Sequence, residues 1–509
     1  MRRGSTNSAV IGLAFLIGVL AVLGWFLFDM QRPNAIAGKK LVVYCAAGIR
    51  PAMQPIIDQY EREFDIDIDV QYAGSNSLLS QIDIARTGDI YIAADESYIN
   101  MAVDRGIVRE AIPVARQRPI IAIKKGNPKN ISSVKDLLRT DVVTAMGNPD
   151  QAAVGKVTRR LLKASGQWKE LESRIQTDGV FKPTVPEVAN DAVLGHVDAA
   201  IIWDATITNY KDKLEAINVP ELDAGVADIA VGVMTSSETP PRALHFARYV
   251  AAPSKGQAVL KAKGFETTPG DPWAEVPKLT FFCGAVNRRA VEPAIDAFKL
   301  REGADISVVY NGCGGLTGSM KTIENQNTDQ GFPDTFMACD IYYLSVVQDW
   351  FEEGLVISDT DIVIVVPKGN PKNIQTLSDL TNDDVQIAVG QPEQCTIGVL
   401  TRRLLAAERI EDKVNIVTQT TSSSLLIPAV TEGAADAVLA YKSDTLAVTD
   451  QIDVIPIASD LSTAIQPFSI ARSSKNKQLA RRLFDAIATS RKQFEAAGFN
   501  WRLESERSE

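Results

Sequence analysis

The chain has 509 residues, of which 45% are hydrophobic and 23% charged, values that exclude a disordered, collagen-like or multi-span membrane protein. Its formal net charge of −10 argues against a nucleic-acid partner, because nucleic-acid binders normally present a basic face. Two histidines, and five cysteines without a CxxC spacing, argue against a His-rich metal site, a zinc ribbon and a thioredoxin-type motif.

The chain begins with an apolar segment. Residues 9–28 read AVIGLAFLIGVLAVLGWFLF without a charge, and Arg2 and Arg3 precede them. Twenty helical residues span about 30 Å, the thickness of a bilayer core, and positive flanks remain cytoplasmic. We therefore predict a single-pass anchor in the cell membrane, with the bulk of the protein in the periplasm or extracytoplasmic space. A cleaved secretory signal is the alternative, because Ala35-Ile36-Ala37 fits a small-residue cleavage site.

The rest of the chain alternates strands and helices. LVVYCA and IDIDVQYA are β-branched runs that predict strands, and PAMQPIIDQYEREF between them has apolar residues at helical spacing. IIAIKK, VVTAMG and DAAIIW predict further buried strands, and VGKVTRRLLKA and PEVANDAVLG predict helices. This alternation favours an α/β fold with parallel or mixed sheets covered by helices.

The second half of the chain repeats the first. LVVYCAAGIRPAMQP from Leu41 aligns with LTFFCGAVNRRAVEP from Leu279, and GNPKNI occurs at Gly126 and again at Gly369. MGNPDQAAVGKVTRRLL likewise aligns with VGQPEQCTIGVLTRRLL. So many ordered matches indicate a tandem duplication. At about 150 residues per domain the length predicts three or four domains, and the repeat makes them four lobes in two pairs.

These patterns predict three segments. Residues 1–39 are the cytoplasmic tip, the anchor or signal segment and a linker. Module 1 covers 40–270, with its second lobe at roughly 118–215. Module 2 covers 278–505, with its second lobe at roughly 361–453, and the Pro- and Gly-rich TTPGDPWAEVP links the two modules.

Small and polar residues fill the loops between strands and helices. In module 1 these loops are AAGIR from Ala46, GSNS from Gly74 and DQAAVG from Asp150. Ligands of open α/β folds bind at the carboxyl ends of strands, where helix N-termini favour an anion. Helix capping and tight turns explain any one loop alone, but three such loops in each of two repeats favour a binding site.

Five segments of module 1 resemble, in order, the substrate-binding protein family of the molybdate ABC transporter: YCAAGIRPAM, YAGSNSLLSQI, GDIYIAADESYINMAVDRGIV, IIAIKKGNPKNISSVKDL and ALHFARYVAAPSKGQAVLKAKGF. The resemblance covers about residues 40–500 as two tandem copies. It implies two class II periplasmic-binding-protein modules, each with two α/β lobes, a hinge and a cleft. It also implies an extracytoplasmic protein that binds a small tetrahedral oxyanion, molybdate or tungstate, and delivers it to an ABC permease in the membrane.

The resemblance further implies which residues contact the ligand. The family uses two Ser hydroxyls, backbone amides and a Tyr hydroxyl, without a counter-charge. The matching positions are, in module 1, Gly48, Ser75, Val154, Val185 and Trp203, and, in module 2, Val286, Cys313, Ile397, Ser423 and Tyr441. Module 1 therefore keeps one of three hydroxyls, and module 2 keeps only the tyrosine.

An arginine stands two residues after the first Ser position in each module. As a hypothesis, Arg50 and Arg288 replace the lost hydroxyls and hold an oxyanion or carboxylate with two hydrogen bonds. The alternative is an arginine on a solvated helix turn.

The cysteines allow two interpretations. Cys45 and Cys283 follow strands, which predicts buried core thiols. Cys283, Cys313, Cys339 and Cys395, however, all map to cleft-facing loops or strand ends of module 2. Dispersed core thiols are one interpretation. The other is a disulfide between Cys313 and Cys395 across the cleft, formed in an oxidising compartment.

No motif indicates catalysis. The chain lacks a GxSxG motif, a P-loop and a Rossmann glycine run, so we predict no catalytic residue, no metal and no cofactor. His196 and His245 fall in predicted helices and are expected on the surface. The alternative function is a membrane-anchored sensor or scaffold in which one or both clefts have lost their ligand.

Overall fold

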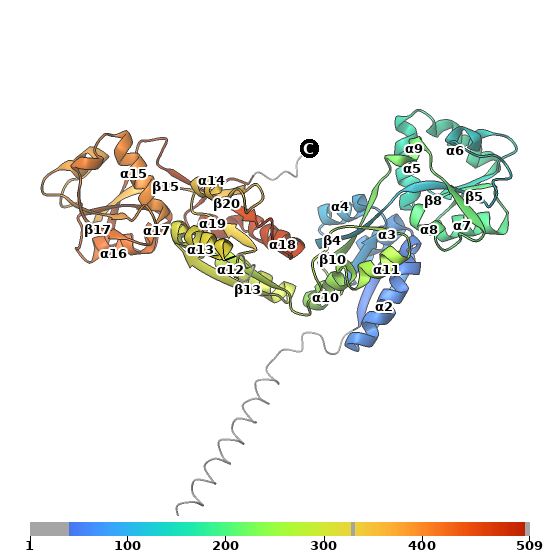
Figure 1. Ribbon diagram of the computed structural model, residues 1–509, viewed down its shortest axis with the longest axis horizontal. Coiled ribbons are helices and arrows are strands. Elements are labelled where there is room, and N and C mark those ends of the chain that lie inside the picture. Colours follow the sequence, from blue (N-terminus) through green and yellow to red (C-terminus); the bar gives the residue numbers. More distant parts are fainter. Residues whose placement is uncertain (1–39, 327–330, 504–509) are drawn as a thin grey trace, which may run out of the picture.

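The computed structural model describes residues 40–326 and 331–503, and it contains two modules of the same α/β architecture, one after the other in the chain (Figure 1). Within these two ranges no helix combines the length and the apolar character needed to cross a membrane. The predicted anchor or signal segment at 9–28 lies outside the described residues.

The first lobe of module 1 is built on a six-stranded sheet in the order β11-β4-β10-β3-β1-β2. β1 pairs in parallel with β2 and β3, and β10 runs antiparallel to β3 and β4. The strands are β1 (Leu41–Ala46), β2 (Ile68–Ala73), β3 (Ile90–Ala93), β4 (Val108–Gln117), β10 (Ala227–Met234) and β11 (Glu266–Thr267). The helices are η1 (Ala47–Ile49), α2 (Arg50–Phe64), α3 (Ser75–Ala85), α4 (Glu96–Asp104), α10 (Pro240–Ala251) and α11 (Gly256–Ala262).

The second lobe of module 1 has a five-stranded sheet in the order β7-β6-β8-β5-β9. The chain enters it after β4 and returns to the first lobe with β10, so two crossings join the lobes. The strands are β5 (Pro119–Lys124), β6 (Thr144–Gly147), β7 (Val180–Lys182), β8 (Ala199–Trp203) and β9 (Leu214–Ile217). The helices are η2 (Val134–Leu138), α5 (Ala153–Ala164), α6 (Trp168–Asp178), α7 (Val185–Leu194), α8 (Asp204–Ile207) and α9 (Pro220–Asp223).

Module 2 repeats this arrangement, except that one long strand, β15 (Leu355–Pro367), belongs to both lobes. Its first half pairs with β20 and its second half with β18 and β19. The other strands are β12 (Lys278–Gly284), β13 (Asp305–Asn311), β14 (Thr335–Met337), β16 (Gln386–Gly390), β17 (Asn415–Thr420), β18 (Ala437–Tyr441), β19 (Ile452–Pro456), β20 (Thr463–Ile470) and β21 (Asn500–Trp501). The helices are η3 (Ala285–Asn287), α12 (Arg288–Glu302), α13 (Cys313–Asn325), α14 (Tyr342–Val347), η4 (Leu377–Thr381), α15 (Thr396–Ala407), η5 (Glu411–Lys413), η6 (Ser423–Leu425), α16 (Leu426–Thr431), α17 (Lys442–Thr445), α18 (Lys477–Ala488) and α19 (Arg491–Ala496).

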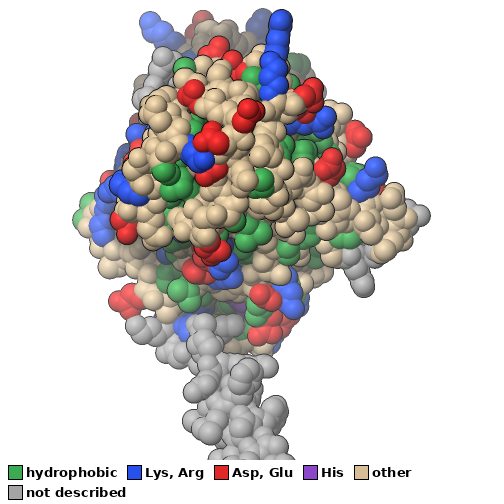
Figure 2. All heavy atoms as spheres, turned by 90° about the vertical axis from the view of Figure 1, so that its left-hand side faces the viewer, with side chains coloured by type: hydrophobic (Ala, Val, Ile, Leu, Met, Phe, Trp, Pro, Cys, Tyr) green, Lys and Arg blue, Asp and Glu red, His purple; other side chains and the backbone are tan. Residues whose placement is uncertain are grey.

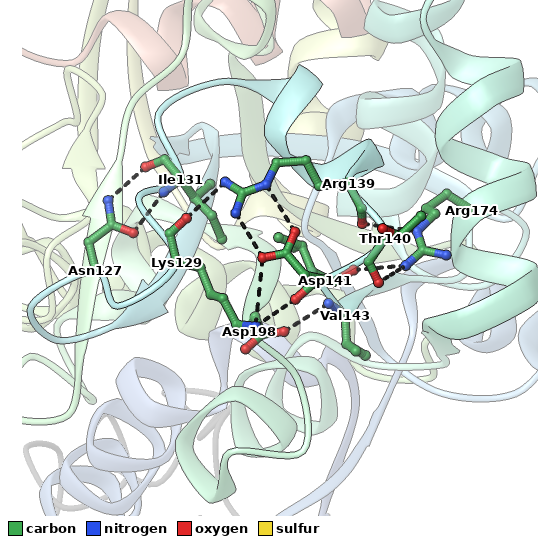
Figure 3. A network of polar contacts seen from close by, with 10 residues as sticks. Asn127, Lys129, Ile131, Arg139, Thr140, Asp141, Val143, Arg174 and Asp198 are labelled. Atoms are coloured by element: carbon green, nitrogen blue, oxygen red, sulfur yellow. Dashed lines mark hydrogen bonds and ion pairs between the residues drawn. The ribbon is translucent and has the colours of Figure 1, made fainter.

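The repeated GNPKNI motif is a structural loop at the start of each second lobe. In module 1 the Asn127 side chain donates to the Ile131 carbonyl and accepts from its N–H, both at 2.8 Å, and Lys129 donates to the Asp141 carbonyl at 2.7 Å. Figure 3 shows this network with Arg139 and Arg174 beside it. Asn370, Ile374 and Lys372 repeat the same bonds in module 2. Asn127 has φ 44°, a backbone region that asparagine tolerates. The motif therefore recurs because it folds the loop.

The two modules meet through their first lobes (Figure 1). Arg248 on α10 of module 1 and Arg482 on α18 of module 2 both donate to the carboxylate of Glu302, which is 1% exposed. Arg301 also forms an ion pair with Glu110 of module 1. The joint is therefore a buried, charged contact between modules, and the second lobes lie at opposite ends of the molecule (Figure 1).

The linker between the modules is part of this joint. Asp271 accepts hydrogen bonds from the N–H groups of Gln478 and Leu479, at 2.9 and 2.8 Å. These residues form the first turn of α18, where N–H groups have no partner within the helix. A linker residue thus caps a helix of module 2.

The prediction of surface histidines is wrong for His245, which is 2% exposed. Its ring lies among Tyr60, Phe64 and Trp273, and its Nδ1 lies 2.8 Å from the Tyr60 hydroxyl. Burial and the charge of Arg248 lower the pKa of His245 to about 3, so the ring is neutral. His196 is exposed, as predicted.

Figure 2 shows the end of the molecule that the second lobe of module 2 forms. Lys and Arg side chains are interspersed there with Asp and Glu, rather than gathered in a patch of one sign.

Candidate functional site

A cleft between the two lobes of module 1 gathers most of the residues predicted for ligand binding. In the closed arrangement its cavity measures about 10 Å³, about the space that one water molecule needs. All twelve lining residues are uncharged: Ala46, Ala47, Gly48, Ala73, Gly74, Ser75, Ala94, Ala152, Ala153, Thr184, Val185 and Trp203. The cleft therefore suits a small, compact occupant held by neutral groups.

Three helices begin at this cleft. α3 begins at Ser75, α5 at Ala153 and α7 at Val185, and none of them has a side-chain hydrogen bond to its first turn in the structure described. The predicted position Val154 is the second residue of α5. Uncapped first turns offer backbone N–H groups and the positive ends of helix dipoles. Both favour an anion in the cleft.

Ser75 supplies a hydroxyl at the start of α3. Its side chain is 1% exposed, and its Oγ accepts from the Ala94 N–H at 3.2 Å. The Tyr91 hydroxyl donates to the Ser75 carbonyl at 2.7 Å. Because a hydroxyl both donates and accepts, the Ser75 proton remains available for a ligand.

Trp203 lies at the end of β8, at the position of the family's tyrosine. Its side chain is fully buried, and its indole Nε1 has no hydrogen-bond partner among the described residues. A Cβ placed on Gly48 would lie 3.6 Å from Trp203 Cδ1, the ring atom bonded to Nε1. The N–H edge of the indole is therefore close to the cleft wall. A buried donor without a partner is unfavourable, and a bound acceptor would remove that penalty.

The lobes of module 1 contact each other across the cleft. The Asn76 N–H donates to the Gln151 carbonyl at 3.2 Å, and its side chain donates to the Asp150 carbonyl at 2.8 Å. Lys156 reaches from the second lobe to Ser97 at 2.7 Å and lies 4.1 Å from the centroid of the Tyr98 ring. These contacts describe a closed module. Sequence reasoning placed Asn76 in a ligand loop but did not identify its partners in the other lobe, and it missed Lys156, because nothing local indicates those contacts.

Gly74 allows this closure. A Cβ at Gly74 would lie 2.5 Å from the Gln151 carbonyl oxygen and 2.8 Å from that of Pro183. Both oxygens belong to the opposite lobe. Gly312, its counterpart in module 2, would overlap the Gln394 carbonyl in the same way. Only a glycine fits where the backbones of two lobes approach so closely.

The arginines lie away from the module 1 cleft. Arg50 is exposed at the start of α2, and its guanidinium carbon lies 5.0 Å from the centroid of the Tyr72 ring. Arg288 stacks on Tyr310 in the same way, at 5.1 Å, and forms an ion pair with Glu292. The structure thus places Arg50 on a helix turn and does not bring it among the residues that line the cleft.

The cleft of module 2 contains different chemistry. Tyr441 ends β18, is 1% exposed, and its hydroxyl has no partner in the described ranges. Burial raises its pKa, and the neighbouring Cys339, Cys395 and Cys313 raise it further. Ile397 lies in the first turn of α15 and Ser423 begins η6. Tyr441 therefore occupies the position of Trp203, surrounded by thiols instead of small apolar groups.

The cysteine contacts differ from the predicted bridge. Cys313 and Cys339 lie with their sulfurs 2.9 Å apart, whereas neither a disulfide nor a hydrogen bond joins Cys313 to Cys395 among the described residues. Both contacting residues belong to the first lobe, because Cys339 follows β14. Cys45 and Cys283 are fully buried, as expected. Burial raises the pKa of Cys395 to about 12.

A second cavity, of about 340 Å³, lies between the lobes of module 2. Val286, Arg288, Arg289, Ser443 and Asp444 are among its lining residues. Burial raises the pKa of Asp444 to about 6. Sequence reasoning missed Asp444, because its chain neighbours suggest only a short helix.

Both modules of the chain match a known protein family. The model of a family described as bacterial extracellular solute-binding protein matches residues 41–266 and again 279–500. A putative binding protein of Haemophilus influenzae is 26% identical over 231 residues, which cover 45% of this chain and 92% of the relative. A molybdate-binding protein of Mycobacterium tuberculosis is also 26% identical over 231 residues, covering 45% and 84%. The solved periplasmic molybdate-binding protein of Azotobacter vinelandii is 16% identical, covers 44% of this chain and 98% of its own, and has a TM-score of 0.39. The two family matches confirm the tandem duplication.

Proposed function

The chain belongs to the family of bacterial extracellular solute-binding proteins, and from that membership we propose that it serves an ABC transporter. In this proposal it binds a small tetrahedral oxyanion, molybdate or tungstate first, between the lobes of a module and delivers it to a permease in the membrane. The predicted anchor at 9–28 would hold the binding modules at the outer surface of that membrane. The molybdate-binding relative from Mycobacterium tuberculosis supports this choice of ligand.

The observation that carries the proposal is the unpartnered N–H of Trp203. A fully buried donor at the edge of an uncharged cleft is best satisfied by an acceptor that enters from outside. The hydroxyl of Ser75 and the first turns of α3, α5 and α7 converge on the same cavity. Donors from several directions suit a ligand with several oxygens around one centre.

The size and charge of the cleft support an inorganic ion over an organic solute. The small cavity of about 10 Å³ and its small, uncharged lining residues favour a compact ligand over a sugar or an amino acid in the closed form. Neutral donors and helix dipoles stabilise an anion without a counter-charge. Closure brings these donors together, so ligand binding and lobe closure are coupled.

Isothermal titration calorimetry of the purified full chain with molybdate, tungstate, sulfate and phosphate tests the proposal. We expect heat of binding with molybdate or tungstate, and a higher melting temperature in their presence. Phe substitutions of Trp203 and of Tyr441, made separately, identify which module accounts for the binding. Absence of heat and of thermal stabilisation with all four anions would overturn the proposal.

A second candidate function rests on the composition of module 2. Its cleft has Val286 and Cys313 where the family has serines, which favours a sensor or scaffold in which this module no longer binds the transported anion. A binding stoichiometry of one anion per chain, lost in W203F and kept in Y441F, would support a divided role for the two modules.

A further inference from the structure

In module 2, cysteines occupy cleft positions at which module 1 has other residue types. The Ala94 N–H donates to Ser75 Oγ at 3.2 Å. At the same place in module 2, the Cys339 N–H donates to Cys313 Sγ at 3.1 Å. Cys313 therefore corresponds to Ser75, and Cys339 to Ala94.

A third cysteine completes the set. Cys395 precedes α15 as Ala152 precedes α5, within the aligned segments VGQPEQCTIGV and MGNPDQAAVGK. The three corresponding residues of module 1, Ser75, Ala94 and Ala152, all line its cleft. Module 2 has therefore concentrated three of the five cysteines of the chain around one cleft.

Two of these sulfurs are in contact. Cys313 Sγ and Cys339 Sγ lie 2.9 Å apart, and both residues are buried. Gly284 leaves room for the pair, because a Cβ there would overlap the Cys339 sulfur and lie 2.9 Å from that of Cys313. Two thiolates on one tetrahedral zinc ion, each at about 2.3 Å, would be separated by about 3.8 Å. The observed separation is shorter than that spacing, which argues against a shared zinc ion and leaves the two sulfurs in direct contact.

We propose that Cys313 and Cys339 form a reversible disulfide within the cleft of module 2. The oxidant is a small disulfide such as oxidised glutathione. One cysteine thiolate of the pair attacks this small disulfide. The attack breaks the S–S bond of the oxidant, forms a mixed disulfide with the protein and releases one small thiol. The second cysteine then attacks the mixed disulfide, forms the Cys313–Cys339 bond and releases the other small thiol. Both protons of the protein thiols end on the two released thiols, so atoms and electrons balance.

The bond changes what the cleft offers a ligand. In the reduced form the two S–H groups are weak donors, and Cys313 stands where Ser75 supplies a hydroxyl. The disulfide removes both donors and joins the start of α13 to the end of β14. Of the side-chain hydrogen-bond donors that the family uses for its ligand, module 2 then keeps mainly the hydroxyl of Tyr441. The inference goes beyond oxyanion transport and does not depend on what module 1 binds.

The pair is protected while the module is closed. The hydrogen bond with Cys313 and burial raise the pKa of the Cys339 thiol, and the thiol form is a poor nucleophile. Oxidation is therefore expected to be slow in the closed module and faster when the lobes separate, which links the redox state to the occupancy of the cleft.

Thiol counting on the full chain tests the proposal. The native protein is incubated with oxidised glutathione, unfolded, and titrated for free thiols with and without reductant. We expect five thiols in the reduced protein and three after oxidation, and a non-reducing digest that links the Cys313 and Cys339 peptides. The intact mass should fall by two hydrogen atoms.

Two variants make the result specific. C395S should still lose two thiols, because Cys395 is outside the bond. C313S should form no internal disulfide and should lose at most one thiol, to a glutathione adduct. Circular dichroism and the melting temperature check that each variant is folded. Five remaining thiols in the native protein, a link that involves Cys395, or a glutathione adduct as the end product would each overturn the proposal.

Discussion

Arg248 of module 1 donates to the buried carboxylate of Glu302 in module 2, at 2.8 Å. The same carboxylate also accepts from Arg482. Burial alone would raise the pKa of Glu302, but the two guanidinium groups outweigh burial and lower it. The joint between modules therefore depends on one buried anion that pairs with two buried cations.

Replacing Glu302 by Gln should loosen this joint. The change leaves two buried guanidinium groups without their shared carboxylate, and breaking a buried ion pair costs about 3–5 kcal/mol. The free energy of unfolding, measured with guanidinium chloride, should fall by that amount. The matched control is E495Q, which breaks an exposed pair with Arg491 and should change stability by less than about 1 kcal/mol. Equal effects of the two substitutions would show that the joint contributes little.

His245 should make the stability depend on pH. Its pKa is about 3 in the folded protein and 6.5 in the reference state. The unfolded chain therefore binds a proton that the folded chain excludes, so stability is full above about pH 6.5 and falls as the pH is lowered towards 3. Because of this group, the free energy of unfolding should fall by up to about 1.4 kcal/mol for each pH unit in this range. H245N should flatten the pH dependence of the melting temperature over this range, whereas the exposed His196 gives the control H196N, which should not.

Trp203→Phe should weaken anion binding without unfolding the protein. The substitution removes the indole N–H and keeps an aromatic ring at the end of β8. A hydrogen bond to a charged group contributes about 1.5–3 kcal/mol, so the dissociation constant should rise by about 10- to 150-fold. The control is W168F, a buried tryptophan of the same lobe that lies outside the cleft lining. An unchanged affinity in W203F would mean that the indole N–H does not contact the anion.

Gly74→Ala should hold module 1 open. The backbone of Gly74 has φ −65° and ψ 146°, which alanine adopts easily, but the added methyl group would collide with Gln151 of the other lobe. Overpacking of this kind costs about 1–3 kcal/mol, here only in the closed form, so affinity should fall by about 5- to 150-fold. X-ray scattering should show a larger radius of gyration in the presence of ligand. G318A, at a helical glycine with no atom within 4 Å of the added Cβ, is the control and should close normally.

The architecture was largely predictable from the sequence because the hydrophobic patterns are local and occur twice. Strands such as LVVYCA and DAAIIW are buried on both faces and read as continuous apolar runs. The family resemblance assigned Ser75 and Trp203 to one cleft, and both residues line it. His245 shows the limit of the same reasoning. His245 is buried by Tyr60 and Trp273, which are far from it in the chain. The spacing of apolar residues along its helix does not predict these contacts.

The pairing of the cleft cysteines was not predictable. Cys313 follows Ser75 by 238 positions, but Cys339 follows Ala94 by 245, because the loop before β14 is longer in module 2. Sequence alignment at a single offset therefore hides the correspondence that the strand pairing reveals. The stacking of Arg50 on Tyr72 was likewise hidden, since a sequence gives the position of an arginine but not the direction of its side chain.

The cap that Asp271 provides for α18 makes each copy of the duplication depend on the other for part of its stability. A chain cut before Lys278 would lose that carboxylate, and a chain that ended at 270 would leave Arg248 without Glu302. Each copy thus supplies contacts that stabilise the other. Natural selection would then preserve both copies for their contribution to folding, even where only one of them still binds the solute, and module 2 would be free to acquire new chemistry in its cleft.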